Sequence, residues 1–116
     1  EQAITLALAQ NKRVFVDVTA DWCITCKANK FNVLLRDDVQ QALSAPDVVA
    51  LRGDWSRPSD SIASFLRQRG SVAIPFNQIY GPGLTDGEIL SPLLDRSTLL
   101  ATLSQAGIAP SQGETK

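Results

Sequence analysis

The chain of 116 residues contains no histidine and no methionine, and it has only two cysteines and one tyrosine. The lack of histidine excludes Ser-His-Asp and Cys-His catalytic mechanisms and every zinc site that uses an imidazole ligand. The lack of methionine removes the thioether ligands on which many copper sites depend. The chemistry that remains is that of cysteine, carboxylate and lysine side chains.

Long apolar runs and long runs of one charge are missing as well. No apolar stretch approaches the roughly 20 residues of a membrane-spanning helix, and the net charge is −1 without a long basic run. Nucleic acid and anionic membrane surfaces attract concentrated positive charge, so neither is expected as a partner. The chain starts at Glu1 with no initiator methionine or signal-like segment, and we interpret it as a soluble, monomeric domain excised from a longer precursor.

The hydrophobic pattern predicts one domain at 1–108 and a disordered tail at 109–116. Helices are predicted at 1–10, 23–43, 59–70 and 97–107, the second with a kink near Asn29 and Asn32. Strands are predicted at 13–18, 47–52, 76–80 and 87–90, the first two apolar enough to be buried on both faces. This order indicates an α/β fold with a central mixed sheet of about four strands and helices on both faces.

The two cysteines lie in Trp22-Cys23-Ile24-Thr25-Cys26-Lys27, directly after the first predicted strand. Two intervening residues on the first turn of a helix bring the sulfurs close enough to bond, and the helix dipole stabilises the first thiol as a thiolate. The motif therefore predicts a pair that cycles between dithiol and disulfide. The alternatives are a static disulfide, which would remove little chain entropy from so short a loop, and a Cu(I) site with only these two thiolates.

Residues 16–27, together with Ile74-Pro75, resemble the thioredoxin superfamily and imply a thioredoxin-like fold. Residues 20–23, Cys26-Lys27 and 53–56 are similar to the C-terminal periplasmic domain of DsbD-type transmembrane thiol reductases. Residues 73–78 and 80–83 resemble the suppressor-of-copper-sensitivity (ScsB-like) branch of that group, with its link to copper tolerance.

The resemblance implies a protein-disulfide reductase that needs no cofactor besides its own redox-active disulfide. It implies a periplasmic location, as a domain of an inner-membrane protein. Electrons would come from the membrane-embedded domain of the same parent protein and pass to a disulfide in a periplasmic thioredoxin-like or N-terminal domain. The direction depends on the reduction potential, so an oxidase or isomerase remains an alternative.

The resemblance also assigns the catalytic roles. Cys23 would be the exposed nucleophile that attacks a partner disulfide, and Cys26 the buried thiol that resolves the mixed disulfide. Asp17, six residues before Cys23, matches the buried acid that takes up the Cys26 proton. Burial should raise the pKa of Asp17; the alternative is a partly solvated carboxylate at a strand end.

Four residues are expected to bind the partner: Trp22, Trp55, Ile74 and Pro75. Pro75 matches a cis-proline that faces the dithiol and leaves the Ile74 backbone free to pair with an extended segment; the alternative is an ordinary edge-strand proline. Trp22 is expected to shield the dithiol. Trp55 either packs within its loop or contacts the partner.

Two lysines are expected to modulate the reactivity of the cysteines. Lys27 either favours the Cys23 thiolate or is a solvated surface residue. Lys30 stands where DsbD-type relatives often have an acidic residue, and its positive charge should lower the pKa of Cys23. Asn77 and Gln78 are more polar than is usual after the cis-proline; they reach a partner, or Gln78 faces solvent. No metal-binding residue is assigned.

Overall fold

The structure, a computed structural model, describes residues 2–71 and 73–107, and it contains one four-stranded sheet. The strands are β1 (Arg13–Thr19), β2 (Val48–Asp54), β3 (Phe76–Gly81) and β4 (Leu84–Ile89). Their order is β2-β1-β3-β4, with β1 parallel to β2 and antiparallel to β3, and β3 antiparallel to β4. The predicted mixed sheet is confirmed; the predicted tail at 109–116 lies outside the described residues.

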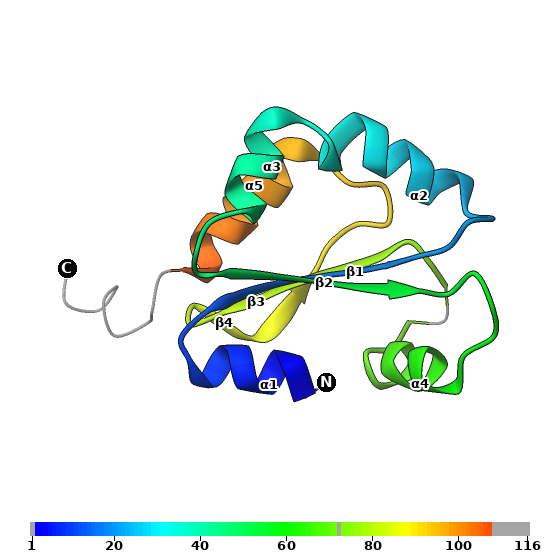
Figure 1. The fold of residues 1–116 in the computed structure, drawn as a ribbon, viewed down its shortest axis with the longest axis horizontal. Helices are drawn as coiled ribbons and strands as arrows, with labels where there is room; N and C mark the ends of the chain where they lie inside the picture. The colour runs from blue at the N-terminus through cyan, green and yellow to red at the C-terminus, as the bar shows by residue number, and fades with distance from the viewer. Residues whose placement is uncertain (1, 72, 108–116) are drawn as a thin grey trace.

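Helices cover both faces of the sheet, as predicted (Figure 1). They are α1 (Gln2–Ala9), α2 (Ile24–Asn29), α3 (Asp37–Leu43), α4 (Asp60–Gln68) and α5 (Arg96–Ala106), with a π-helical turn, η1 (Lys30–Leu34), after α2. Helices α1 and α4 lie on one face of the sheet, and α2, α3 and α5 lie on the other. Among the described residues, no helix combines the length and the apolar character that a bilayer crossing requires.

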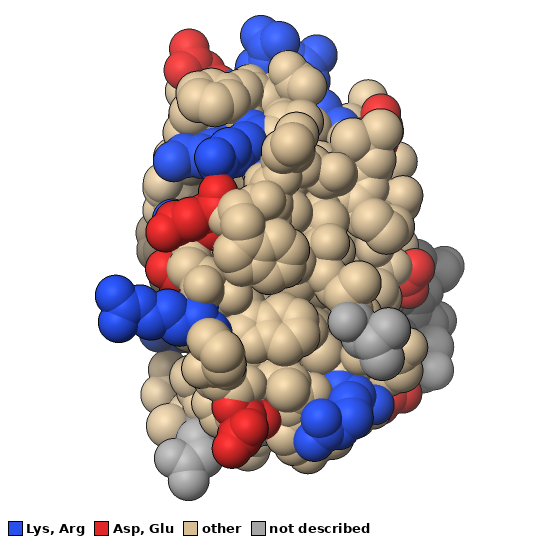
Figure 2. Space-filling view, turned by 90° about the vertical axis from the view of Figure 1, so that its right-hand side faces the viewer, with Lys and Arg blue, Asp and Glu red and all other residues tan. Residues whose placement is uncertain are grey.

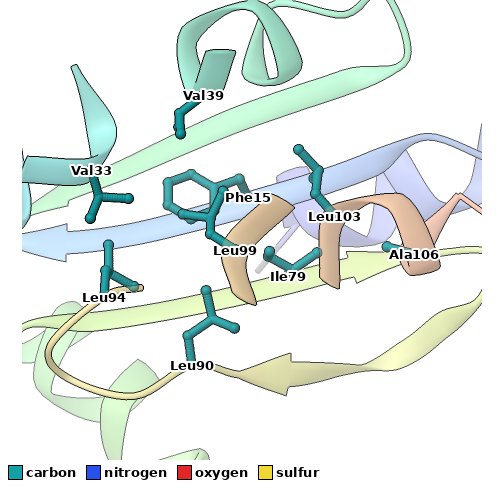
Figure 3. Close-up of a cluster of buried hydrophobic side chains, with 9 residues drawn as sticks. All are labelled: Phe15, Val33, Val39, Ile79, Leu90, Leu94, Leu99, Leu103 and Ala106. Carbon is teal, nitrogen blue, oxygen red and sulfur yellow. The ribbon is translucent and has the colours of Figure 1, made fainter. Parts of the chain in front are cut away.

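The alternation of side chains along β1 divides the core into two layers. Val14, Val16 and Val18 pack toward α1 and α4, whereas Phe15 packs toward α3 and α5. Figure 3 shows this second layer, in which Phe15 and Ile79 of the sheet meet Leu99 of α5. Strand β1 is thus the buried centre of the sheet, and the short loop after its carboxyl end leads into α2.

Three predicted elements differ from the structure. Strand β2 was expected to be buried, but it is an edge strand with an alternating half-buried and exposed pattern, because only β1 pairs with it. The predicted helix at 23–43 is divided into α2, η1 and α3. The wider turn of η1 changes which side chains face the core, so Phe31 is 66% exposed and Val33 is buried instead. Strand β4 starts at Leu84 rather than at residue 87.

Candidate redox site

The disulfide lies at the start of α2, where the chain leaves the carboxyl end of β1. Cys23 and Cys26 are bonded, with 5.2 Å between their Cα atoms. Cys23 is the N-cap of α2, and its Sγ accepts a hydrogen bond of 3.1 Å from the backbone N–H of Cys26. In the reduced protein this N–H is placed to stabilise a thiolate on Cys23, since a charged acceptor makes the stronger hydrogen bond.

The two cysteines are almost equally buried, with 6% of Cys23 and 7% of Cys26 exposed. This corrects the expectation of an exposed Cys23. The reason is local packing: Ala20 forms a cluster with both cysteines, and Trp55 and Ile74 pack against that cluster. Apolar side chains therefore surround the disulfide and restrict its exposure.

The two tryptophans have different environments. Trp22, expected to shield the dithiol, is 61% exposed, whereas Trp55 packs against the cluster that contains the disulfide. Both line a groove of about 490 Å3 together with Ile74, Arg57 and Pro58. The structure thus brings three of the four predicted partner-binding residues to one groove.

The fourth of these residues, Pro75, directly follows the groove residue Ile74. The peptide bond between Ile74 and Pro75 is cis, the conformation that the resemblance implies. Figure 2 shows the end of the molecule at which β1 finishes and α2 starts; uncharged side chains form the centre of this face, and most charged side chains lie around it. Such a face suits contact with a protein surface.

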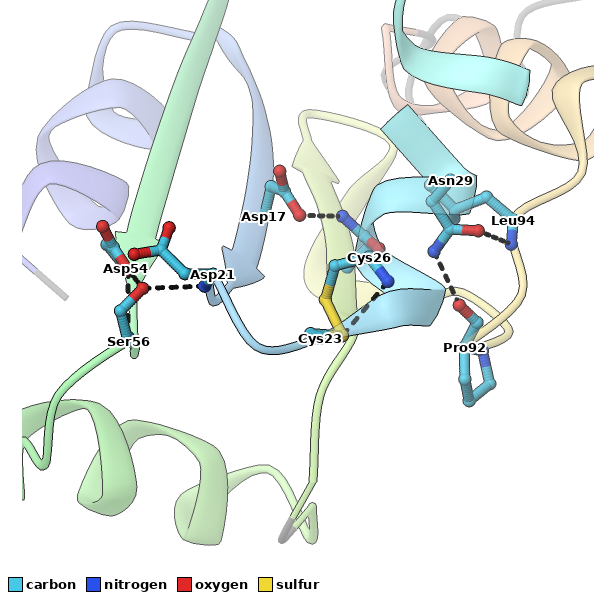
Figure 4. Close-up of a disulfide and its surroundings, with 10 residues drawn as sticks. Asp17, Asp21, Cys23, Cys26, Asn29, Asp54, Ser56, Pro92 and Leu94 are labelled. Atoms are coloured by element: carbon cyan, nitrogen blue, oxygen red, sulfur yellow. Dashed lines mark hydrogen bonds between the residues drawn. A yellow bond between two sulfur atoms is a disulfide. The ribbon is translucent and has the colours of Figure 1, made fainter. Parts of the chain in front are cut away.

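Asp17 lies in the middle of a polar row that crosses three strands. The sheet register pairs it with Arg52 on β2 and with Asn77 on β3. The side-chain N–H of Asn77 donates to Asp17 Oδ1 at 2.9 Å, drawn as a dashed line from Asp17 in Figure 4. Burial raises the pKa of Asp17, and the Asn77 hydrogen bond and the Arg52 charge oppose that rise.

Asp17 and Cys26 line the same cavity of about 260 Å3, on the side of α2 that faces β1 and β2. Lys27 and Lys30 line this cavity too. Both lysines, expected to act on the Cys23 thiolate, are therefore also placed to act on Asp17 and Cys26.

Two polar residues that position the site, Asn29 and Ser56, were given no role in it from the sequence. Asn29 is 2% exposed; its amide donates to the Pro92 carbonyl at 2.8 Å and accepts from the Leu94 N–H at 3.0 Å, which fixes the end of α2 to a distant loop (Figure 4). Ser56 Oγ accepts from the Asp21 N–H at 2.8 Å and donates to Asp54. Asn29 had been noted only as a possible kink.

The polar residues after the cis-proline are buried, which corrects one expectation. Asn77 is 1% and Gln78 is 3% exposed, so Gln78 does not face solvent. Its Oε1 accepts from Arg69 Nε at 2.9 Å and from the Tyr80 hydroxyl at 2.9 Å, on the α1 and α4 side of the sheet. Among the described residues, no group of three or more His, Cys, Asp or Glu side chains is arranged to hold a metal ion.

The chain was compared with known proteins. A family model described as thioredoxin-like matches residues 1–82. The thiol:disulfide interchange protein DsbD of Yersinia enterocolitica is 33% identical over 70 residues, which are 60% of this chain and 12% of that protein. The chain thus corresponds to a small part of this curated relative.

Solved structures share the fold. The C-terminal domain of Neisseria meningitidis DsbD has a TM-score of 0.69 at 24% identity in its reduced form, over 90% of this chain and 91% of that one. Its oxidised form has a TM-score of 0.71 at 22% identity, over 90% of each chain. A thioredoxin from Thermus thermophilus has a TM-score of 0.67 at 23% identity, over 98% of this chain and 86% of that one. With its CxxC disulfide at the end of a central strand, the chain belongs to the thioredoxin-like family and is a thiol:disulfide oxidoreductase domain.

Proposed function

We propose that this domain is the electron-delivering module of a periplasmic protein-disulfide reductase. The observation that carries the proposal is the surroundings of the Cys23–Cys26 disulfide: the groove residues Trp55 and Ile74 pack against its cluster, and Cys26 lines the cavity that contains Asp17. The groove is suited to a protein partner and the cavity to proton transfer. The partial match to DsbD supports a parent protein in the inner membrane, whose membrane-embedded dithiol reduces the domain.

The reduction of a partner has two steps in this proposal. The Cys23 thiolate attacks a partner disulfide, so a mixed Cys23–partner disulfide forms and one partner sulfur leaves as a thiolate. Cys26 then gives its proton to the Asp17 carboxylate, and its thiolate attacks Cys23 Sγ. The Cys23–Cys26 bond forms, the mixed disulfide breaks, and the electron pair leaves with the second partner sulfur, which takes up a proton. The partner gains two electrons and the domain becomes the disulfide.

The identity of the acceptor, the branch of the family and the roles of individual residues are proposed from the sequence resemblance. The acceptor is a disulfide in a periplasmic thioredoxin-like or N-terminal domain, and the residues at 73–83 favour the suppressor-of-copper-sensitivity branch, with a role in copper tolerance. Trp22, Trp55, Ile74 and Pro75 contact the acceptor. Lys27 and Lys30 act on the thiols through their charge.

A trapping experiment tests the proposal. In a Cys26→Ser variant produced in the periplasm, the mixed disulfide cannot be resolved, so a partner should remain linked to Cys23 and be identified by mass spectrometry after non-reducing electrophoresis. The matched control is Cys23→Ser, which should capture no partner because Cys26 faces the inner cavity. Equal capture by both variants, or capture by neither, would contradict the assignment of Cys23 as the nucleophile.

The direction of electron flow has its own test. Equilibration of the domain with glutathione buffers should give a reduction potential in the range of reducing thioredoxins, about −270 mV, and not that of strong oxidants such as DsbA, about −120 mV. Cu(I) titration of the reduced domain is the parallel measurement. A reduction potential near the oxidant value would refute the assignment as a reductase. Tight stoichiometric Cu(I) binding without exchange with protein disulfides would refute it as well.

A further inference from the structure

Asn77 is a buried amide beside the proposed proton acceptor, and the proposed function gives it no role. It lies on β3 directly opposite Asp17 on β1, and its side chain is 1% exposed. Its Nδ2 donates to Asp17 Oδ1 at 2.9 Å and lies 3.5 Å from the Val16 carbonyl oxygen. Both contacts use the nitrogen of the amide, which fixes the orientation of the side chain.

The oxygen atom of the Asn77 amide differs from the nitrogen in this respect. Asn77 Oδ1 is buried and has no hydrogen-bond partner among the residues that the structure describes. A buried polar atom without a hydrogen-bond partner destabilises the folded protein relative to a paired one. An apolar residue of similar size would avoid that cost, so the amide needs a reason beyond packing.

The hydrogen bond between Asn77 and Asp17 discriminates between the two protonation states of the carboxyl group. An ionised carboxylate accepts from the Asn77 N–H, whereas a protonated carboxyl group would need an acceptor for its own proton. Turning the amide by 180° would offer Oδ1 to that proton, but it would give up both contacts of Nδ2. The observed orientation therefore favours the carboxylate.

The remaining charges near Asp17 do not come from β3. The charged residues that line its cavity are Arg52 and Asp54 on β2, Lys27 on α2, Lys30 on η1 and Asp21 in the loop after β1. Of these, Arg52 is the register partner of Asp17 and stabilises its charge. On the opposite side of Asp17, strand β3 supplies Asn77, an uncharged hydrogen-bond donor.

We propose that Asn77 is a positioning residue that holds Asp17 as a carboxylate, ready to take the proton of Cys26 when the mixed disulfide is resolved. This proposal rests on the proposed role of Asp17. It goes further in giving a function to a buried amide on β3 that the proposed function does not use. The amide offsets part of the effect of burial, so the acceptor stays available near neutral pH.

The test compares two buried amides on one strand. In Asn77→Leu and in Asn77→Ala the donor is lost, and the carboxyl signal of Asp17, followed by NMR in the oxidised domain, should titrate at higher pH than in the unchanged protein. Gln78→Leu is the matched control: Gln78 is equally buried but bonds Arg69 and Tyr80 on the other face, so the Asp17 titration should not move. The alanine variant covers the case in which leucine prevents folding.

The kinetic readout is the release of a model partner from the mixed disulfide. Both Asn77 variants should release it roughly tenfold more slowly at neutral pH, and raising the pH should restore the rate. In an Asp17→Asn background, replacing Asn77 should have no further effect. An unchanged Asp17 titration overturns the proposal, and so does a shifted titration with an unshifted release profile. Because the titration needs no partner, it remains decisive even if the domain proves not to be a reductase.

Discussion

Replacing Asp17 by asparagine should slow the release of a reduced partner from the mixed disulfide by about 10²–10⁴-fold at neutral pH, the usual contribution of a positioned general base. The amide keeps the size of the side chain but cannot take the proton of Cys26. Attack of Cys23 on the partner precedes this step, so it should be little affected. Stopped-flow measurement of both steps across pH separates them.

The shape of the pH dependence is the control for this prediction. In the unchanged domain, release should rise with pH as Asp17 loses its proton. In Asp17→Asn, that rise should disappear and only the titration of Cys26 itself should remain. An identical pH–rate profile in the two proteins would mean that Asp17 takes no part in proton transfer.

The same replacement should make the oxidised domain more stable at neutral pH. Burial raises the pKa of Asp17 in the folded state above its ordinary value of 3.8, so the folded protein holds this proton more tightly than the unfolded chain does. The stability that Asp17 contributes is fully present below that ordinary value and is lost as the pH rises through the folded pKa. The melting temperature of Asp17→Asn should exceed that of the unchanged domain at pH 7, and the difference should shrink as the pH falls from the folded pKa toward about 3.8.

Replacing Gly81 by alanine should have the largest effect on stability, a loss of about 3 kcal/mol or more, because it overpacks a contact between two backbones. A Cβ on Gly81 would collide with the carbonyl oxygen of Ala106 and lie 2.8 Å from the carbonyl carbon. That carbonyl cannot easily move, since it accepts a hydrogen bond of 2.9 Å from the Gly83 N–H and belongs to a residue of α5 with no exposed surface. Thermal unfolding should show a drop in melting temperature on the order of 10 °C.

Gly53→Ala is the matched control for this substitution. Gly53 lies on the edge strand β2, and a Cβ there would meet its nearest atom, Val18 Cγ2, at an ordinary distance of 3.6 Å. The melting temperature of Gly53→Ala should stay close to that of the unchanged domain or rise slightly, because alanine lowers the conformational entropy of the unfolded chain. Equal losses in the two variants would mean that the packing of α5 on β3 does not limit stability.

The sequence predicts well what depends on local signals. The β-branched run at 13–18 predicted the central strand. The helix predicted at 59–70 corresponds to α4, and the hydroxyl of Ser59 caps it by accepting from the Ile62 N–H at 3.3 Å. The CxxC pair predicted the disulfide, since two residues between cysteines leave few other arrangements. These features depend on neighbours along the chain.

The features that were missed depend on residues far away in the sequence. Cys23 is buried because Trp55 and Ile74, which are distant from it in the sequence, pack against its cluster. Strand β2 lies at the edge of the sheet, but its apolar residues give no sign in the sequence that only one neighbouring strand pairs with it. Contact with a partner and exposure to solvent were the two alternatives for Gln78, and its burial was missed because its hydrogen-bond partner Arg69 lies on another element. The pairing of Asp17 with Asn77 required the register of two strands, which the positions of the cysteine motif and the cis-proline define only approximately.

In the proposed reductase, the partner and the proton reach the two cysteines past different sets of side chains. Trp22, Trp55 and Ile74 line the groove, which neither cysteine lines, whereas Cys26 and Asp17 line the separate cavity. A docked protein can therefore close the groove to water without closing the route of the proton. In this proposal the electrons pass to the docked partner while the proton of Cys26 passes to Asp17, so tight binding of a partner need not slow its own release.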